Sequence, residues 1–205
     1  SNYCTFGSQG ASNNEFQYPR GLTVDSSGNI YVADSDNSRI QKFDSSGNHL
    51  MTINAPVGDY GNNGSSPEGV AVDNNGNIYV ADESAGSVQQ FSSTGIAGWT
   101  TTFNPNDNAQ PQDVAVDNSG NVYIAHSNTV ERHDHGSGDG NFYGFSTHGS
   151  ETKGVAVDSS GNVYVVNEGN VIQKFGPSGN LILSFGSTGT GDGEFKSPKR
   201  IALDN

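Results

Sequence analysis

The 205-residue sequence contains only one cysteine, Cys4, so no disulfide can form within the chain. We interpret Cys4 as a small, half-buried apolar residue near a strand rather than as a reactive thiol. No apolar run approaches membrane-spanning length and no signal-peptide pattern opens the sequence, so a leader peptide, if there was one, has been removed. We therefore expect neither a disulfide framework nor insertion into a membrane.

Basic residues are also scarce. Nine Lys and Arg stand against 22 Asp and Glu, which gives a formal net charge of −13. So few basic residues cannot easily form a positively charged surface that contacts successive phosphates. We therefore expect no nucleic-acid partner and no anionic membrane partner. We interpret the acidity as a means of keeping a repetitive β protein soluble.

The composition carries one indication of location. The sequence is poor in Lys and rich in Ser, Asn, Gly and Thr, which we take as typical of an extracellular or cell-surface protein. Asn63-Gly64-Ser65 fits the acceptor pattern for N-glycosylation, and its use would require a secretory route.

Hydrophobic residues make up only 31% of the sequence, and they recur in short bursts of Val, Ile, Tyr and Phe. Turn-forming Gly, Asn, Ser and Asp lie between the bursts, with 28 glycines in all. A disordered chain would lack this periodic apolar content. The pattern therefore predicts an all-β protein of many short strands.

One stretch of fourteen residues occurs four times with small variations. The copies lie at 21–34, 69–82, 113–126 and 154–167. The first aspartate of each copy and one further aspartate are spaced by 48, 44, 41 and 46 residues. These aspartates are Asp25, Asp73, Asp117, Asp158 and Asp204. Periods in this range are typical of propellers and related arrays.

Each period reads as four short strands. In residues 69–103 the strands are GVAVD, NIYVAD, SVQQF and IAGWTTTF, separated by turns rich in Asn, Ser and Gly. Such a narrow sheet cannot bury both of its faces alone, whereas blades stacked around an axis bury them against each other. The aromatic residues that close the third and fourth strands are therefore expected to be core at the rim between blades: Phe43, Phe91, Phe175 and Phe185.

The predicted fold is thus an all-β propeller of four-stranded antiparallel blades, forming a single region over 1–205. Four complete blades are expected at about 21–53, 69–103, 113–145 and 154–185, with partial blades at 1–6 and 200–205. Residues 6–25 and 185–204 align without a gap, so both would claim one equivalent place in a closed four-bladed ring. Two alternatives remain: a piece of a longer propeller, or an open arc that associates with another chain through its exposed blade edges.

The composite pattern P-x-G-[IV]-A-V-D-x-x-G-N-[IV]-Y-V-A-D…R-[IV]-Q-K-F resembles the NHL repeat. It is matched at 19–43, 67–91 and 154–175, and at 111–133 as far as VYIA. This resemblance implies a β-propeller, most often one with six blades. The YVAD element is also similar to the YWTD element of low-density-lipoprotein-receptor propellers, a close structural alternative.

Propellers usually bind ligands on the face formed by the loops that lead into the innermost strands. The residues before the first strand of each copy differ in type while the scaffold repeats, as a grafted binding site would. We call them the strand-start residues and expect one per blade to converge near the axis; the alternative is free variation of exposed loop positions. They are Arg20, Glu68, Gln112, Lys153 and Lys199.

Two other sets of polar residues have a structural interpretation. Asp34 and Asp82 end the second strand, where the other copies carry His126 and Asn167; we expect hydrogen bonds within the blade, with Arg39 as a partner of Asp34, rather than a polar ring. The D-x-x-G-N turns offer one Asp each, too few for a calcium loop, so they are predicted to be hairpin turns.

Residues 126–148 contain four of the five histidines. His133 and His135 alternate and would share one face of a strand, so with His126 or His148 they form a candidate site for zinc or another divalent ion. The alternative, which we favour, is a polar third strand that has lost the QKF core pattern.

The most direct functional interpretation is a non-catalytic binding and scaffolding propeller that recognises a protein, peptide or glycan through its top face, without a cofactor. Some propellers that resemble NHL arrays are lyases, namely peptidyl-hydroxyglycine lyase and the streptogramin lyases, whose metal or catalytic histidines come from different blades. No strand-start residue here is a histidine, and no nucleophile–base pair is recognisable. A metal-dependent lyase and an architectural module of a surface layer or filament remain as alternatives.

Overall fold

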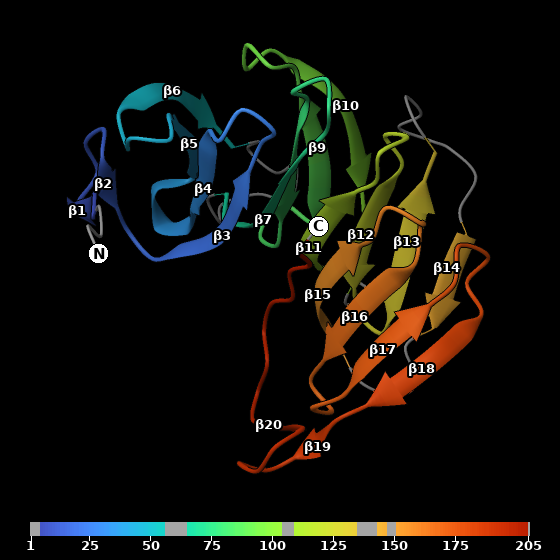
Figure 1. Ribbon diagram of the computed structural model, residues 1–205. Helices are drawn as coiled ribbons and strands as arrows, with labels where there is room; N and C mark the ends of the chain where they lie inside the picture. The colour runs from blue at the N-terminus through green and yellow to red at the C-terminus, as the bar shows by residue number, and fades with distance from the viewer. Residues whose placement is uncertain (1–4, 56–64, 104–108, 135–142, 147–150, 205) are drawn as a thin grey trace. The chain divides into compact units, whose positions relative to one another are not determined.

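The computed structural model describes residues 5–55, 65–103, 109–134, 143–146 and 151–204 (Figure 1). Cys4, Asn63, His135 and His148, which the sequence singles out, lie outside these ranges. The chain divides into two compact units, unit 1 (Ser1–Phe103) and unit 2 (Asn104–Asn205), which are described one at a time. In the described residues, no helix is long and apolar enough to cross a membrane.

Unit 1 contains two sheets of four strands, each a meander in which neighbours along the chain pair antiparallel. Blade 1 has a short 3₁₀ turn, Ser35–Asn37, between its second and third strands. The strands of blade 1 are β3 (Pro19–Val24), β4 (Ile30–Asp34), β5 (Arg39–Phe43) and β6 (His49–Asn54). Those of blade 2 are β7 (Pro67–Val72), β8 (Ile78–Asp82), β9 (Ser87–Phe91) and β10 (Ala97–Thr102).

Unit 2 repeats this arrangement with two further antiparallel meanders. The strands of blade 3 are β11 (Pro111–Val116), β12 (Val122–His126), β13 (Thr129–His133) and β14 (Tyr143–Ser146). Those of blade 4 are β15 (Thr152–Val157), β16 (Val163–Asn167), β17 (Ile172–Phe175) and β18 (Leu181–Phe185). The predicted class, all-β with four-stranded antiparallel propeller blades, is confirmed.

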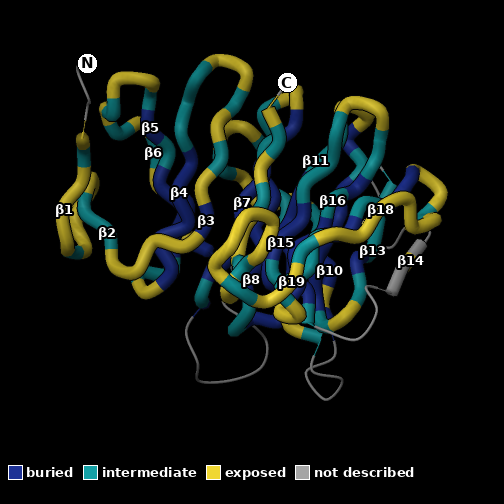
Figure 2. Tube along the Cα trace, turned by 60° about the horizontal axis from the view of Figure 1, so that its bottom comes forward, coloured by how far each residue is buried: buried dark blue, intermediate teal, exposed yellow. Residues whose placement is uncertain are grey.

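Each unit has a core between the facing sheets of its two blades, and Figure 2 shows the second strands as mostly buried and the turns as mostly exposed. In unit 1 the core joins Tyr31, Ala33, Ile40 and Ile53 of blade 1 to Val70, Ile78, Val80 and Phe91 of blade 2. In unit 2 it joins Ala115, Tyr123, Ala125 and Val130 of blade 3 to Val155, Val163, Val165 and Phe175 of blade 4. The period-2 pattern of each strand therefore places β-branched and aromatic side chains where neighbouring blades meet.

The innermost strands approach each other closely at a repeated glycine. A Cβ atom on Gly21 would lie 2.6 Å from the carbonyl oxygen of Glu68. In unit 2 a Cβ on Gly154 would lie 2.9 Å from the carbonyl oxygen of Lys199. Glycine at this position therefore allows the backbones to pack where the blades are narrowest.

Three of the four aromatic residues predicted for the rim are buried: Phe43, Phe91 and Phe175. Phe185 differs, since 43% of its surface is exposed. It ends β18, the outer strand of blade 4, in which all five residues are exposed. The sequence pattern places the residue on its strand correctly but does not tell whether a neighbouring element covers that strand.

Short segments flank the blades. In unit 1, β1 (Ser8–Gln9) and β2 (Glu15–Phe16) form a two-residue parallel bridge ahead of blade 1. In unit 2, β19 (Ser187–Thr188) and β20 (Glu194–Phe195) form the same bridge after blade 4. Residues 198–204 have no strand assignment.

Candidate functional site

The strand-start residues of neighbouring blades come into contact within each unit. In unit 1, Arg20 Nη1 lies 3.5 Å from Glu68 Oε2, and the Glu68 side chain is largely buried. In unit 2, Lys153 Nζ donates to Gln112 Oε1 at 3.4 Å. Lys199 is exposed. The structure therefore brings together the expected residues in pairs, while convergence of all five around one axis stays a prediction.

Lys153 is the centre of an acidic neighbourhood. Its Nζ atom lies 2.8 Å from Glu151 Oε1 and 3.2 Å from Glu168 Oε1. Burial alone would lower the pKa of Lys153, but the two carboxylates outweigh it and raise that pKa. An ammonium group held in its charged form is suited to binding and not to proton abstraction.

A second set of charges, which the sequence reasoning missed, occupies the repeated glycine position. Gly21, Gly69 and Gly154 align with Asp113 and Arg200 in the other two copies. Asp113 Oδ1 and Arg200 Nη1 form an ion pair of 3.2 Å. The departures from glycine were visible in the alignment and could have indicated this site.

The Asp113–Arg200 pair binds the backbone around it. The amide of Val155 donates to Asp113 Oδ2 at 3.1 Å, and Arg200 Nη1 donates to the carbonyls of Gln112 and Lys153 at 2.8 and 3.0 Å. Burial raises the pKa of Asp113, although the charge of Arg200 opposes this. The pair therefore joins the starts of three successive inner segments of unit 2.

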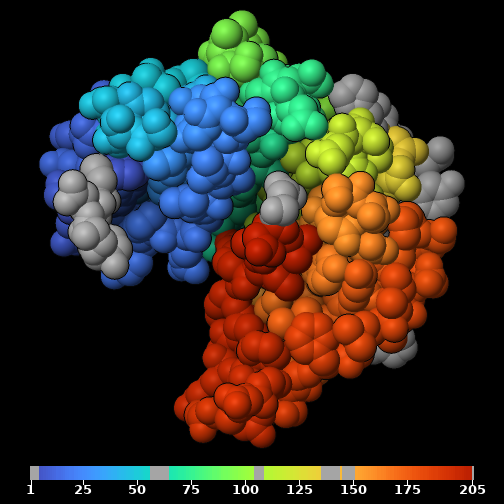
Figure 3. Space-filling model, viewed as in Figure 1, coloured from blue at the N-terminus to red at the C-terminus, as the bar shows by residue number. Residues whose placement is uncertain are grey.

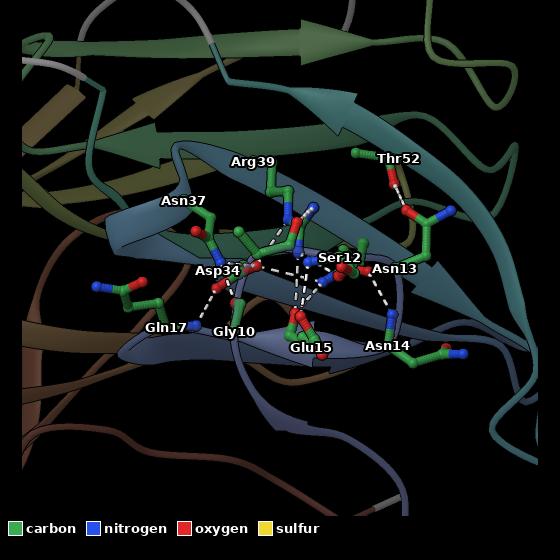
Figure 4. Close-up of polar contacts among 12 residues, drawn as sticks. Gly10, Ser12, Asn13, Asn14, Glu15, Gln17, Asp34, Asn37, Arg39 and Thr52 are labelled. Carbon is green, nitrogen blue, oxygen red and sulfur yellow. Dashed lines mark hydrogen bonds and ion pairs between the residues drawn. The ribbon is translucent and has the colours of Figure 1, made fainter.

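A polar hub in blade 1 is formed by Asp34, Asn37, Arg39 and Gln41, of which Figure 4 labels the first three. The predicted pair of Asp34 and Arg39 is present, with 2.7 Å between Oδ2 and Nε. Asn37 and Gln41 also donate to Asp34 Oδ2, at 2.9 and 3.2 Å. The hub reaches beyond its own blade, because the amide of Gln17 donates to Asp34 Oδ1 at 2.6 Å.

The equivalent positions in two other blades have local partners as well. Asp82 accepts a hydrogen bond from the Ser65 hydroxyl, and from the amides of Ser66 and Ala85 at 3.0 and 2.8 Å. The amide of Val171 donates to Asn167 Oδ1 at 3.3 Å. These residues satisfy backbone groups near their own strands, as the intrablade interpretation predicts.

The D-x-x-G-N turns use both oxygens of their aspartate. In the four first hairpins, Oδ1 accepts from two backbone amides at 2.8–3.0 Å, and Oδ2 accepts from the Asn side chain at 2.8 Å. A Tyr hydroxyl two residues after that Asn also donates to Oδ2, at 3.0–3.3 Å. The hydroxyls belong to Tyr31, Tyr79, Tyr123 and Tyr164. These carboxylates are thus turn-forming groups, and the hairpin interpretation agrees with the structure.

Two histidines of blade 3 flank one carboxylate. His126 Nε2 lies 3.1 Å from Glu131 Oε1, and His133 Nε2 lies 3.6 Å from Glu131 Oε2. Burial would raise the pKa of Glu131, but the two neighbouring imidazoles outweigh it and lower that pKa to about 2. The sequence singled out both histidines but not Glu131. Over the described ranges, no three His, Cys, Asp or Glu side chains are arranged to hold a metal ion.

Antiparallel four-stranded blades that recur along a chain and pack face to face define the β-propeller class. The model of the NHL repeat matches residues 16–43 and 65–91, which contain the D-x-x-G-N-x-Y turns and third strands of blades 1 and 2. The chain therefore carries two NHL repeats within blades of the propeller class. No curated protein matches the sequence.

Solved structures similar to this chain have the propeller fold in common with it. Virginiamycin B lyase from Staphylococcus aureus is 18% identical, with a TM-score of 0.68 over 87% of this chain and 57% of that chain. A catalytically inactive variant of that lyase with quinupristin is 19% identical, with a TM-score of 0.70 over 94% and 60%. Hydrazine synthase from Kuenenia stuttgartiensis is 15% identical, with a TM-score of 0.67 over 84% and 50%. This chain thus spans 50–60% of the length of these proteins, and at such identities the likeness concerns the fold alone.

Proposed function

We propose that the chain is a non-catalytic binding and scaffolding module, which recognises a protein, peptide or glycan through its strand-start residues. The observation that carries this proposal is the contact between unlike strand-start side chains of neighbouring blades, Arg20 with Glu68 and Lys153 with Gln112. Within each unit, unlike polar side chains on a repeated scaffold lie in contact and offer hydrogen-bond donors and acceptors to a ligand. Binding function on a propeller depends on such local groups and not on the fold itself.

The chemistry of these groups favours binding over catalysis. Lys153 is held as a cation by Glu151 and Glu168, and Arg20 carries a guanidinium, a group suited to binding carboxylates through paired hydrogen bonds. Cations beside carboxylates can form charge-assisted hydrogen bonds with a carboxylate, an amide or a sugar hydroxyl of a ligand. We expect recognition of a polar ligand, with an affinity that falls as salt concentration rises.

The test is a screen of the immobilised protein against a peptide display library and a glycan array. A variant with Arg20, Glu68 and Lys153 all replaced by alanine should bind the selected ligand at least about tenfold more weakly. A control variant with Asp36, Lys42 and Lys196 replaced by alanine has the same change in charge and should bind as the wild type does. Equal binding by the two variants would show that the strand-start residues are not the site.

A metal-dependent lyase is the second candidate function, and one specific observation favours it. Two of the similar solved structures are virginiamycin B lyase, and one of these contains quinupristin. The direct test is incubation of the protein with quinupristin, with and without added divalent metal ions, followed by mass spectrometry. Metal-dependent conversion of quinupristin would establish the lyase and displace the binding proposal.

We also propose an extracellular or cell-surface location, because the sequence is poor in Lys and rich in Ser, Asn, Gly and Thr. Surface proteolysis of intact cells that produce the protein, followed by immunoblotting, tests this location. Protection of the protein until the cells are lysed would contradict it.

A further inference from the structure

The first hairpin of blade 2 differs from those of the other blades in the residue before its turn glycine. Blades 1, 3 and 4 carry Ser-Gly at this place, at 27–28, 119–120 and 160–161, whereas blade 2 carries Asn75-Gly76. Asparagine followed by glycine is the pair most prone to deamidation, because a glycine without Cβ leaves its amide nitrogen open to attack the asparagine side chain. Among the four first hairpins, that of blade 2 alone contains this reactive pair.

The side chain of Asn75 is accessible. Asn75 is exposed and Gly76 is half-buried, and in Figure 3 the turquoise-green segment around residue 75 reaches the surface of unit 1. Within the described ranges, the side-chain amide of Asn75 has no hydrogen-bond partner. Water can therefore reach this amide, and no hydrogen bond of the side chain holds it away from the Gly76 nitrogen.

The backbone of the same hairpin holds the reacting nitrogen in place. The Gly76 amide donates to the carbonyl oxygen of Asp73 at 3.0 Å. The amides of Asn75 and Asn77 donate to Asp73 Oδ1 at 2.9 and 2.8 Å. Asp73 Oδ2 in turn accepts from the side chains of Asn77 and Tyr79 at 2.8 and 3.1 Å. A nitrogen whose proton is donated to a carbonyl is not free to attack, so the closed turn protects Asn75.

We propose that Asn75 is a deamidation site whose reaction is controlled by opening of the Asp73 turn. In the open turn, the Gly76 nitrogen loses its proton and attacks Asn75 Cγ. The C–N bond of the side-chain amide breaks, and ammonia leaves with a succinimide ring formed behind it. One water molecule then opens this ring, so that amide and water have become carboxylate and ammonium. The rate follows the population of the open turn.

Both products of ring opening weaken the turn. One product is aspartate, whose new charge repels the buried carboxylate of Asp73. The other is isoaspartate, in which the main chain passes through Cβ and gains one carbon between the amides of residues 75 and 77. These two amides can then no longer both reach Asp73 Oδ1. Because ammonia is lost to the solvent, the modified molecule keeps a loosened turn in blade 2.

Incubation of the 205-residue protein at mildly alkaline pH in heavy-oxygen water tests this proposal. Peptide mapping by mass spectrometry should show one solvent oxygen at Asn75, resolved from Asn63, the other asparagine that precedes glycine. Electron-transfer fragmentation distinguishes aspartate from isoaspartate. Asn75→Ser, which introduces the residue of the other first hairpins, should abolish the modification at this position. A peptide of residues 70–80, too short to keep the turn closed, should react at least about tenfold faster than the protein.

Two further variants test the control by the turn. Asp73→Ala removes the acceptor carboxylate and should accelerate deamidation at least about tenfold. Tyr79→Phe removes one hydrogen bond to this carboxylate, so it should give a smaller acceleration in a turn that is otherwise intact. Circular dichroism checks that each variant is folded.

Three outcomes would overturn the proposal. The first is a folded protein in which Asn75 stays unmodified while the peptide is converted. The second is a rate in the folded Asp73→Ala and Tyr79→Phe proteins that equals the wild-type rate, because the turn would then not control the reaction. The third concerns the modified protein, which anion exchange separates by its added charge. It should melt at a lower temperature than the unmodified protein, and equal melting temperatures would contradict the loosened turn.

Discussion

Asp113 and Arg200 form an ion pair on the backbone around Gly154, with 3.2 Å between Oδ1 and Nη1. Their side chains differ in exposure, at 11% for Asp113 and 33% for Arg200. Both replace the glycine of the repeat, and they do so in two segments that flank the same inner strand of unit 2. The repeat position that is glycine in the other copies therefore carries a negative charge in one copy, Asp113, and a positive charge in another, Arg200.

Arg200→Ala should lower the free energy of unfolding by about 1–3 kcal/mol, because it leaves the buried carboxylate of Asp113 without its cation. Urea denaturation followed by circular dichroism measures the change. In an Asp113→Gly background, which restores the glycine of the repeat, the same substitution should cost at least about 1 kcal/mol less. Equal costs in the two backgrounds would mean that the ion pair contributes nothing to stability.

Asp73→Ala should destabilise unit 1 by about 2–4 kcal/mol, because four hydrogen bonds to a buried carboxylate are lost. Asp44→Ala is the matched control. Asp44 forms the same turn between β5 and β6, but position 50 is Leu and the tyrosine bond is missing. We expect a clearly smaller cost there, because this turn is exposed to solvent. Comparable urea midpoints for both variants would show that the tyrosine and the burial add nothing.

Burial and the nearby charge of Asp117 raise the pKa of Tyr123 to about 12, from its ordinary value of 10.0. The fold therefore favours the neutral phenol. The resulting stability is complete below pH 10.0 and is lost as pH rises toward about 12. The difference between the alkaline absorbance titrations of the wild type and Tyr123→Phe gives this pKa. A midpoint near the ordinary value would contradict the hydrogen bond to Asp117.

The folded state lowers the pKa of Glu131 from its ordinary value of 4.5 to about 2. Because the pKa is lowered, the stability that ionised Glu131 contributes is present above pH 4.5 and is lost as the pH falls toward 2. Glu131→Gln should therefore cost about 1–3 kcal/mol at neutral pH and progressively less in acid. Unfolding in urea at a series of pH values measures the difference. If the difference in stability between the wild type and Glu131→Gln does not change with pH, the histidines are not its cause.

Much of the fold follows from residues that are close in sequence. The Asp of each D-x-x-G-N turn meets its amides and its Asn within four residues, so the pattern itself predicts the hairpin. The bond from the Tyr hydroxyl was not predicted, because strand periodicity tells which face a side chain occupies and not which atom it reaches. Arg39 was matched with Asp34 from their spacing for the same local reason.

Contacts between distant segments were harder to predict. Arg39 also binds the carbonyls of residues 11–15, and backbone carbonyls leave no signature in the identity of the residue. Asp113 and Arg200 did leave one, in the loss of two glycines, but only the structure shows that both bind the backbone around Gly154. The strand-start residues met in pairs because the register of neighbouring copies is fixed by the packing of the core.

The self-contained aspartate turns have a consequence for how such a protein changes over generations. Each first hairpin carries the hydrogen-bond partners of its own carboxylate, so a duplicated blade needs no compensating substitution elsewhere to fold its turn. Nearest-neighbour packing then joins the new blade through faces that its neighbours already possess. Gene segments of one blade length can therefore be gained or lost as units, and the same property makes individual blades exchangeable modules for protein engineering.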